Sequence, residues 1–147
     1  MGDGQDFRPD VPPFYSALAE VKAAVQYRCD EIEVRDLNLL LDVARESQQQ
    51  IDCKGFEYRG KKRFMELMFS DGELDLVIIL IEPEEYESLA EQFLETYGKT
   101  THDSRIGLFF YDSAVAIRTR PHECVFVSKR ARANYQLYMD DMAEQAT

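Results

Sequence analysis

The sequence predicts an α+β protein with a largely antiparallel five-stranded sheet, in the order α-α-β-β-β-α-β-β-α, and with helices packed on it. Three observations predict this fold. A turn signal, Asp71-Gly72, separates two apolar segments; the apolar periodicity changes from strand to helix at Pro83; and a polar turn, Asp112-Ser113, separates two further apolar segments. Strands that are joined by such short turns run antiparallel.

Asp71-Gly72 is expected to form a two-residue turn, because Asp and Gly tolerate the positive φ that this turn needs at both positions. The strand before the turn covers residues 64–70. The strand after it contains six consecutive apolar residues, 76–81, which is typical of a central strand covered on both faces. A short strand at residues 53–59 is expected to precede this hairpin as its edge.

The central helix is expected to begin at Pro83, because proline is favoured at the first helical position and acidic residues in the first turn complement the helix dipole. Gly98 stands where a left-handed C-terminal cap belongs. One apolar stripe recurs at helical spacing and predicts the buried face: Tyr86, Leu89, Ala90, Phe93, Leu94 and Tyr97. The opposite face is acidic and is expected to face solvent.

Two helices are expected in the N-terminal third. The first opens at Pro12-Pro13, and the second carries an apolar stripe between Leu37 and Ile51; one long bent helix is an alternative. The residues 48–50, all Gln, are expected to be polar surface at a helix end. Residues 1–11 are predicted to be a disordered lead-in and residues 12–147 a single α+β domain.

The C-terminal third predicts strands at residues 106–111 and 115–120, and Pro121 is expected to end the second of them or to leave it at a sheet edge. Residues 124–127 form a last short strand or a continuation past a bulge. Ser128 is a good N-cap for a closing helix. Residues 99–104 are expected to be a polar connector. The closing helix has its own apolar stripe: Ala131, Tyr135, Tyr138, Met139 and Met142.

Composition and targeting signals favour a soluble cytoplasmic protein. The chain has 147 residues and a formal charge of −11, which disfavours nonspecific binding to nucleic acid or to an anionic membrane. It has no secretory signal pattern and no run of eighteen apolar residues. The three cysteines, Cys29, Cys53 and Cys124, are odd in number and without paired spacing, so we expect unpaired buried thiols in a reducing compartment.

Charge is separated along the chain. Residues 71–95 hold nine acidic residues and no Lys or Arg, whereas residues 105–132 hold six basic residues and two acidic ones. This separation singles out candidate partner-binding residues: Glu84, Glu87, Glu91, Arg118, Arg120, Lys129, Arg130 and Arg132. The basic group either pairs with acids of the same fold or contacts a partner. We expect no nucleic-acid binding, because Tyr135 and Tyr138, the residues that would stack on bases, lie on the apolar stripe of the closing helix.

Candidate chemistry is sparse, and we predict no metal, cofactor or catalytic residue. A zinc site would need His122 and Cys124 together with Cys53 or His102, but two histidines are few for four ligands. A nucleophilic Cys124 would need His122 as its base and His102-Asp103 as an orienting pair, and nothing in their spacing requires this.

The element order from the second helix onward resembles that of class I type III secretion chaperones, which are small, acidic, cytosolic and homodimeric. The resemblance is one of layout and acidity, and no residue role follows from it. It implies a noncatalytic acidic protein-binding module, such as a chaperone, adaptor or regulator, that forms a homodimer and binds another protein. The first alternative is an acidic inhibitor or immunity-type protein that blocks a basic surface. The second is a small-ligand sensor or an enzyme of unknown type.

Overall fold

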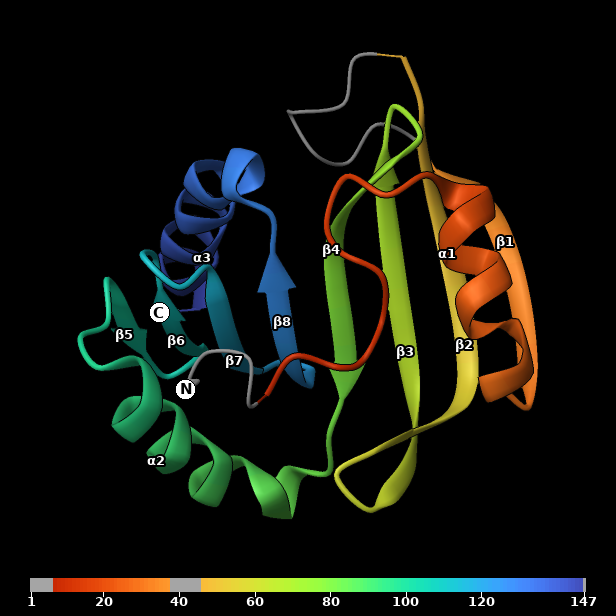
Figure 1. Cartoon of the computed structure of the whole chain (residues 1–147). Helices are drawn as coiled ribbons and strands as arrows, with labels where there is room; N and C mark the ends of the chain where they lie inside the picture. Colours follow the sequence, from red (N-terminus) through yellow and green to blue (C-terminus); the bar gives the residue numbers. More distant parts are fainter. Residues whose placement is uncertain (1–6, 38–45, 147) are drawn as a thin grey trace. The chain divides into compact units, whose positions relative to one another are not determined.

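A computed structural model describes residues 7–37 and 46–146. The α+β class is confirmed: these residues form three α-helices and eight strands, and the pairings described below are antiparallel. The prediction of five strands is therefore wrong. The chain divides into two compact units, which we call the N-terminal unit (Pro9–Ile79) and the C-terminal unit (Leu80–Thr147 with Met1–Arg8). Figure 1 shows the elements of both.

In its described residues, 9–37 and 46–79, the N-terminal unit contains one α-helix, a short 3-10 helix and four strands in the order β1-β2-β3-β4. Their bounds are α1 Leu18–Val25, η2 Gln26–Arg28, β1 Glu31–Leu37, β2 Gln48–Tyr58, β3 Lys61–Ser70 and β4 Glu73–Leu80.

The central hairpin is confirmed. Asp71 and Gly72 have φ values of 53° and 84°, and Ser70 pairs with Glu73 across the turn. Asp71 Oδ1 also accepts hydrogen bonds from the backbone N–H groups of Glu46 and Ser47, at 2.7 and 3.1 Å. The turn is therefore held by the segment that leads into β2. Residues 74–79 of β4 are buried without interruption, as the apolar run predicts.

The second predicted helix is wrong wherever the structure describes it, and so is the alternative of one long bent helix. Residues 31–37 form β1, residues 48–51 open β2, and residues 38–45 of the predicted helix lie outside the described residues. Gln48 and Gln50 are buried in β2 (2% and 4% exposed), not on a helix surface. Pairing of β2 along β3 satisfies the backbone of this segment, and this tertiary pairing outweighs a helical spacing of apolar residues. The first helix begins at Leu18, later than its predicted start at residues 12–13.

A disulfide joins Cys29 to Cys53, whose Cα atoms are 5.3 Å apart. The expectation of three unpaired cysteines is therefore wrong; Cys124 alone is free, and it is buried. Cys29 follows η2, and the backbone N–H of Asp30 donates to Lys54 O at 2.6 Å, so the antiparallel alignment of β1 on β2 brings the two sulfurs together. A separation of 24 residues carries no local signal of this pairing.

The C-terminal unit has two α-helices, two 3-10 helices and four strands in the order β8-β7-β6-β5. Their bounds are η3 Pro83–Glu85, α2 Tyr86–Tyr97, β5 His102–Ser104, β6 Gly107–Phe110, β7 Val115–Thr119, β8 His122–Val127, η4 Lys129–Ala131 and α3 Arg132–Ala146. Residues 124–127 belong to a separate strand, β8. Strand β5 lies in the predicted polar connector, and its polar residues show no apolar alternation by which to recognise it.

The predicted ends of the two helical segments are confirmed. Pro83 begins η3, and the side chains of Glu82 and Glu85 form a capping box there. Gly98 ends α2 at the predicted position with a positive φ of 81°, but its ψ of −119° is not that of the predicted left-handed cap. Ser128 accepts a hydrogen bond through its side chain from the Ala131 N–H, as expected of an N-cap.

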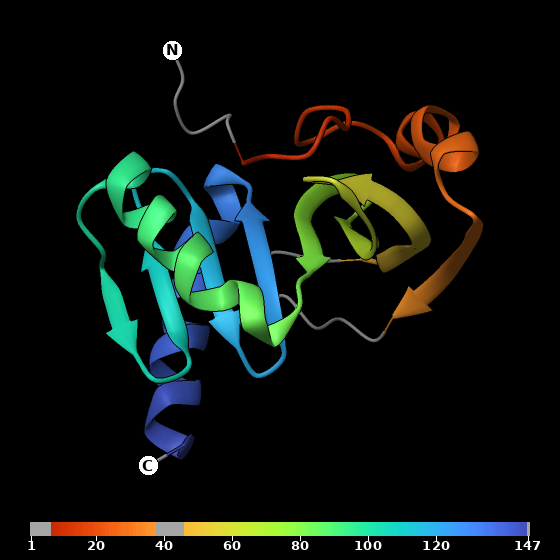
Figure 2. The ribbon, with the colours of Figure 1, turned by 90° about the horizontal axis from the view of Figure 1, so that it is seen from below.

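Helices α2 and α3 cover opposite faces of the strands β5 to β8. Phe109 and Phe110 are neighbours on β6, so their side chains point to opposite faces. The Phe110 ring centroid lies 5.5 Å from that of Tyr97 on α2, whereas the Phe109 ring centroid lies 5.3 Å from that of Tyr135 on α3. Figure 2 shows α2 in front of these strands and α3 behind them. A side chain on the outer surface of α2 therefore cannot reach α3 through the sheet.

The predicted element order that resembles type III secretion chaperones is not found in the structure. The resemblance begins with a helix followed by three strands, but the structure has strand β1 at residues 31–37 and eight strands in its described residues.

Candidate functional site

The outer surface of α2 and η3 carries a row of exposed carboxylates. We call Glu84, Glu87, Glu91 and Glu95 the acidic face of α2; spacings of three and four residues place them along one side of the helical segment. Within residues 7–37 and 46–146, none of the four has an ion-pair or hydrogen-bond partner. Leu94 lies beside them and is 43% exposed, so its predicted place in the buried stripe is wrong.

Arg118 is buried between the sheet and α3. Its side chain is 6% exposed, and its Nη1 lies 3.1 Å from Oε2 of Glu123, which is equally buried. Its guanidinium also stacks over the Tyr138 ring, with Cζ 5.1 Å from the ring centroid. Burial raises the pKa of the adjacent Tyr135, so its phenol remains protonated at neutral pH. Arg118 is therefore not presented to a partner in this structure.

Arg132 also has contacts within the C-terminal unit. Its Nη1 lies 3.4 Å from the carbonyl oxygens of Tyr111 and Asp112, and its Cζ is 4.4 Å from the centroid of the Tyr111 ring. The side chains of Arg120, Lys129 and Arg130 are exposed. The structure thus does not bring the five predicted basic residues together as one surface. Arg118 and Arg132 lie on the α3 side of the sheet, away from the acidic face of α2.

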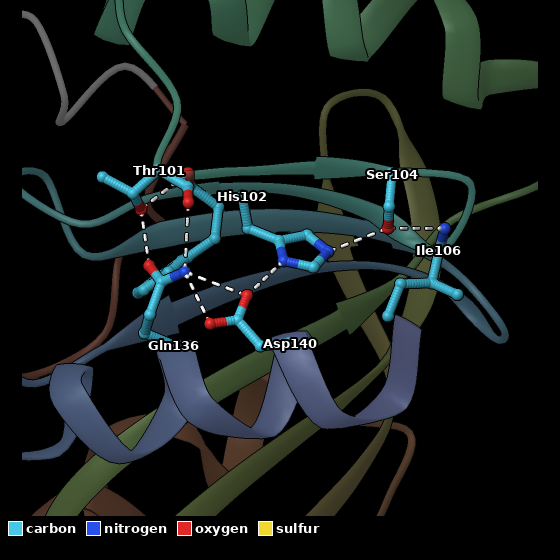
Figure 3. Close-up of polar contacts among 7 residues, drawn as sticks. Thr101, His102, Ser104, Ile106, Gln136 and Asp140 are labelled. Carbon is cyan, nitrogen blue, oxygen red and sulfur yellow. Dashed lines mark hydrogen bonds and ion pairs between the residues drawn. The ribbon is translucent and has the colours of Figure 1, made fainter. Parts of the chain in front are cut away.

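A polar relay links α3 to the edge strand β5. His102 Nδ1 lies 2.6 Å from Asp140 Oδ1, and His102 Nε2 lies 2.8 Å from Ser104 Oγ. Figure 3 shows the imidazole of His102 between the other two side chains. His102 is 9% exposed, Ser104 is half-buried, and the side chain of Asp140 is 50% exposed. We call these three residues the Asp-His-Ser relay.

Gln136 holds the carboxylate of the relay from the preceding turn of α3. Its Nε2 lies 3.2 Å from Asp140 Oδ1 and 3.1 Å from Thr101 O, and its Oε1 accepts a hydrogen bond from Thr101 Oγ1 at 2.6 Å. Figure 3 shows this second set of contacts beside His102. Two hydrogen-bonded groups, on Gln136 and His102, therefore orient Asp140.

The sequence offered a partial signal for the relay. His102 and Ser104 are two residues apart in a strand, which places them on one face, but residues 99–104 were expected to be a connector without a strand. His102 and Asp103 were considered only as an orienting pair for a Cys124–His122 site; in the structure His102 contacts Asp140, 38 residues away. This partner depends on the docking of α3 against β5.

The residues considered for metal binding or cysteine chemistry are placed differently. Cys53 is bonded to Cys29, and Cys124 is fully buried in β8. The His122 ring packs edge-on against Tyr86, with their centroids 5.9 Å apart. No group of three or more His, Cys, Asp or Glu side chains suited to a metal ion occurs in the part of the chain that the structure describes.

The N-terminal unit contains a second charged cluster. Asp52 and Glu66 are direct cross-strand partners on β2 and β3, and Arg35 Nε lies 2.7 Å from Asp52 Oδ2. An open cavity of about 520 Å³ beside this cluster is lined by Glu31, Ile32, Glu33, Asp52, Lys54 and Phe64. Its lining is mainly charged, unlike the largely apolar lining of typical small-molecule sites. Burial, and then the charge of Asp52, raise the pKa of Glu66, while Arg35 opposes this shift.

The substitution Glu66→Gln is expected to stabilise the protein at pH 7, by about 0.2–1 kcal/mol, because it removes a like-charge pair directly across two strands. A carboxyl whose pKa is raised by folding stabilises the fold below its unfolded pKa and loses that contribution as the pH rises through the folded pKa. The gain should therefore shrink between pH 7 and pH 4. Urea unfolding at both pH values measures it; a loss of stability at pH 7 would contradict the assigned repulsion.

Comparison of the chain with protein-family models, with curated proteins and with solved structures gave no match. The function is therefore inferred from the fold and from the sites of this chain alone. No helix in the described residues is long and apolar enough to cross a membrane.

Proposed function

We propose that this protein is an acidic protein-binding module that uses the acidic face of α2 to bind a basic partner. The observation that carries the proposal is the row of four exposed carboxylates without a basic partner in the described residues. Glu87, Glu91 and Glu95 are four residues apart, and like charges at this spacing destabilise a helix by roughly 0.2–0.5 kcal/mol per pair. A cationic partner would relieve this repulsion, and the exposed Leu94 offers it an apolar contact.

The positions of two basic residues support the same proposal. Arg118 is paired with the buried Glu123, and Arg132 lies over Tyr111, both on the other side of the sheet from α2. Neither neutralises the acidic face. Binding at this face requires no catalytic group, in agreement with a chaperone, adaptor or regulator.

The alternative of an acidic inhibitor or immunity-type protein uses the same surface. It differs in the partner, which would be an enzyme whose basic groove is covered by α2. Loss of the partner's activity on binding distinguishes this alternative from an adaptor.

A homodimer and a cytoplasmic location remain proposals from the sequence. Light scattering coupled to size exclusion tests the first, and a strict monomer at micromolar concentration would contradict it. The disulfide argues against the second, since such bonds persist mainly in oxidising compartments.

Neutralising the acidic face should weaken partner binding. The partner is the protein that co-purifies with the tagged chain from its own host. We expect the triple variant Glu84→Gln, Glu87→Gln and Glu91→Gln to bind it at least tenfold more weakly at low salt, and with a smaller salt dependence, because exposed charge attraction is screened by ions.

The matched control changes the net charge equally at exposed acids of the N-terminal unit: Glu20→Gln, Glu33→Gln and Glu57→Gln. It should bind as the wild type does in an isothermal titration. Equal weakening in both triple variants would show that net charge, and not the acidic face of α2, governs binding.

A further inference from the structure

The hydrogen-bonding capacities of the Asp-His-Ser relay determine its proton positions when His102 is neutral. An ionised carboxylate only accepts hydrogen bonds, so Asp140 Oδ1 accepts one from the Nδ1–H of His102. The other ring nitrogen, Nε2, then carries a lone pair and accepts from the hydroxyl of Ser104. The Ile106 backbone N–H, 3.3 Å from Ser104 Oγ, occupies one acceptor position of the same oxygen. The serine proton is therefore directed at the histidine.

This arrangement has the three connections that an activated serine requires. A base lies within hydrogen-bond reach of the nucleophile, at 2.8 Å, and a third group holds the base, at 2.6 Å. The side chain of His102 is 7% exposed and contacts the half-exposed carboxylate of Asp140, so the positive charge that the imidazole gains during attack forms beside a negative charge. Ser104 is half-buried at the end of β5 and stays open to solvent.

We propose that Ser104 is a nucleophile in acyl transfer and that His102 is its general base. Asp140 orients the imidazole of His102 and stabilises the positive charge that it gains. This inference goes beyond the binding role proposed for α2, from which the relay is separated by the sheet. It assigns a reaction and three residues to the alternative of an enzyme, which the sequence left open.

The reaction balances with water as the only co-reactant. Ser104 Oγ bonds to the acyl carbon of an ester while its proton passes to His102 Nε2. The tetrahedral intermediate then expels the alcohol, which takes that proton. Water next attacks the acyl-serine, loses its proton to His102, and releases the carboxylic acid as Ser104 Oγ recovers the proton.

Local charge indicates the class of ester. The carboxylate of Asp140 lies beside His102, and the chain has a formal charge of −11, so an anionic acyl group would be repelled. We therefore expect a neutral or cationic ester as the substrate. The Ile106 N–H contacts Ser104 Oγ itself in this structure, so it is not directed at a separate oxyanion.

The test uses the full chain, a fluorophosphonate probe and p-nitrophenyl acetate. The wild type should form one adduct, on Ser104 by peptide mass spectrometry, and should hydrolyse the ester faster than buffer. General-base assistance typically contributes on the order of 10²–10⁴-fold. Ser104→Ala should therefore abolish the adduct and reduce ester turnover to the buffer rate, and His102→Gln should lower turnover at least about 100-fold.

Asp140→Asn keeps the shape of the orienting residue and should slow labelling at least tenfold while the circular dichroism spectrum stays native. Ser113→Ala, at an exposed serine of the β6–β7 turn, is the matched control and should react as the wild type does. Absence of an adduct on folded wild-type protein, or labelling that survives in Ser104→Ala at the wild-type rate, would overturn the proposal. So would unchanged labelling in folded Asp140→Asn.

Discussion

Glu123→Ala is expected to lower the free energy of unfolding by about 3–5 kcal/mol, the largest effect of any single substitution considered, because it leaves a buried guanidinium without its counter-charge. Both side chains of the Arg118–Glu123 pair are 6% exposed, and the two residues are direct cross-strand partners on β7 and β8. When Glu123 is removed, Arg118 stays buried, so the free-energy cost of taking its charge out of water remains while the attraction to Glu123 is lost. Urea unfolding at pH 7, followed by circular dichroism, measures the difference.

Replacing both members by apolar residues separates this mechanism from a simple loss of packing. Arg118→Met combined with Glu123→Leu should recover most of the lost stability, since neither charge then needs a partner. The matched control is the exposed pair Lys54–Glu31, at 3.2 Å, where Glu31→Ala should have a small effect because solvent screens both charges. An equally large loss in the exposed pair, or a double variant less stable than Glu123→Ala, would contradict the assignment.

Reduction of the Cys29–Cys53 disulfide is expected to destabilise the protein by about 3 kcal/mol, from the loop-closure entropy of its 24-residue separation. For a chain of this size the melting temperature should fall by about 10 °C. A thermal melt with and without a phosphine reductant measures it. The Cys29→Ser, Cys53→Ser double variant should melt like the reduced protein and should not respond to the reductant.

Counting the reactive thiols tests the Cys29–Cys53 disulfide independently of the melting temperature. Unfolded protein without reductant should show one reactive thiol, that of Cys124, and reduced protein should show three. Three thiols in protein taken directly from its native compartment would contradict a native disulfide and would favour the cytoplasmic location.

The parts of the fold that were predicted correctly depend on chemistry within a few residues. Asp71-Gly72 adopts the positive φ values of a tight turn, and Gly98 adopts the positive φ of a helix end. Pro83 and Ser128 begin the segments they were expected to begin. Each is decided by the conformational preference or hydrogen bonding of the residue itself, so neighbouring sequence suffices.

The parts that were wrong depend on distant strands. The segment at residues 48–51 was assigned to a helix from its apolar spacing, but β3 pairs with residues 48–53 and 56–58 of β2. The three residues of β5 are a strand because β6 pairs with them, with His102 opposite Phe109 and Ser104 opposite Gly107. Neither pairing can be predicted from the residues of the segment alone.

The candidate sites divide in the same way. Helical periodicity alone placed Glu84, Glu87 and Glu91 on the outer surface of the central helix, and the structure has them exposed there. The basic residues were grouped by proximity in sequence, yet Arg118 lies within β7 and is buried against Glu123 and α3, whereas Arg120 lies beyond the end of β7 and is exposed. Proximity in sequence therefore did not predict which of these residues is exposed.

By itself, then, the sequence determined the α+β class, the central hairpin, the helix ends and the acidic face of α2, because turn chemistry, capping and helical periodicity act over a few residues. Only the tertiary structure decided the eight strands, the Cys29–Cys53 bond, the burial of Arg118 with Glu123 and the meeting of Asp140 with His102. Each of these joins residues on different elements, and the free energy that selects them comes from pairing and burial across the fold.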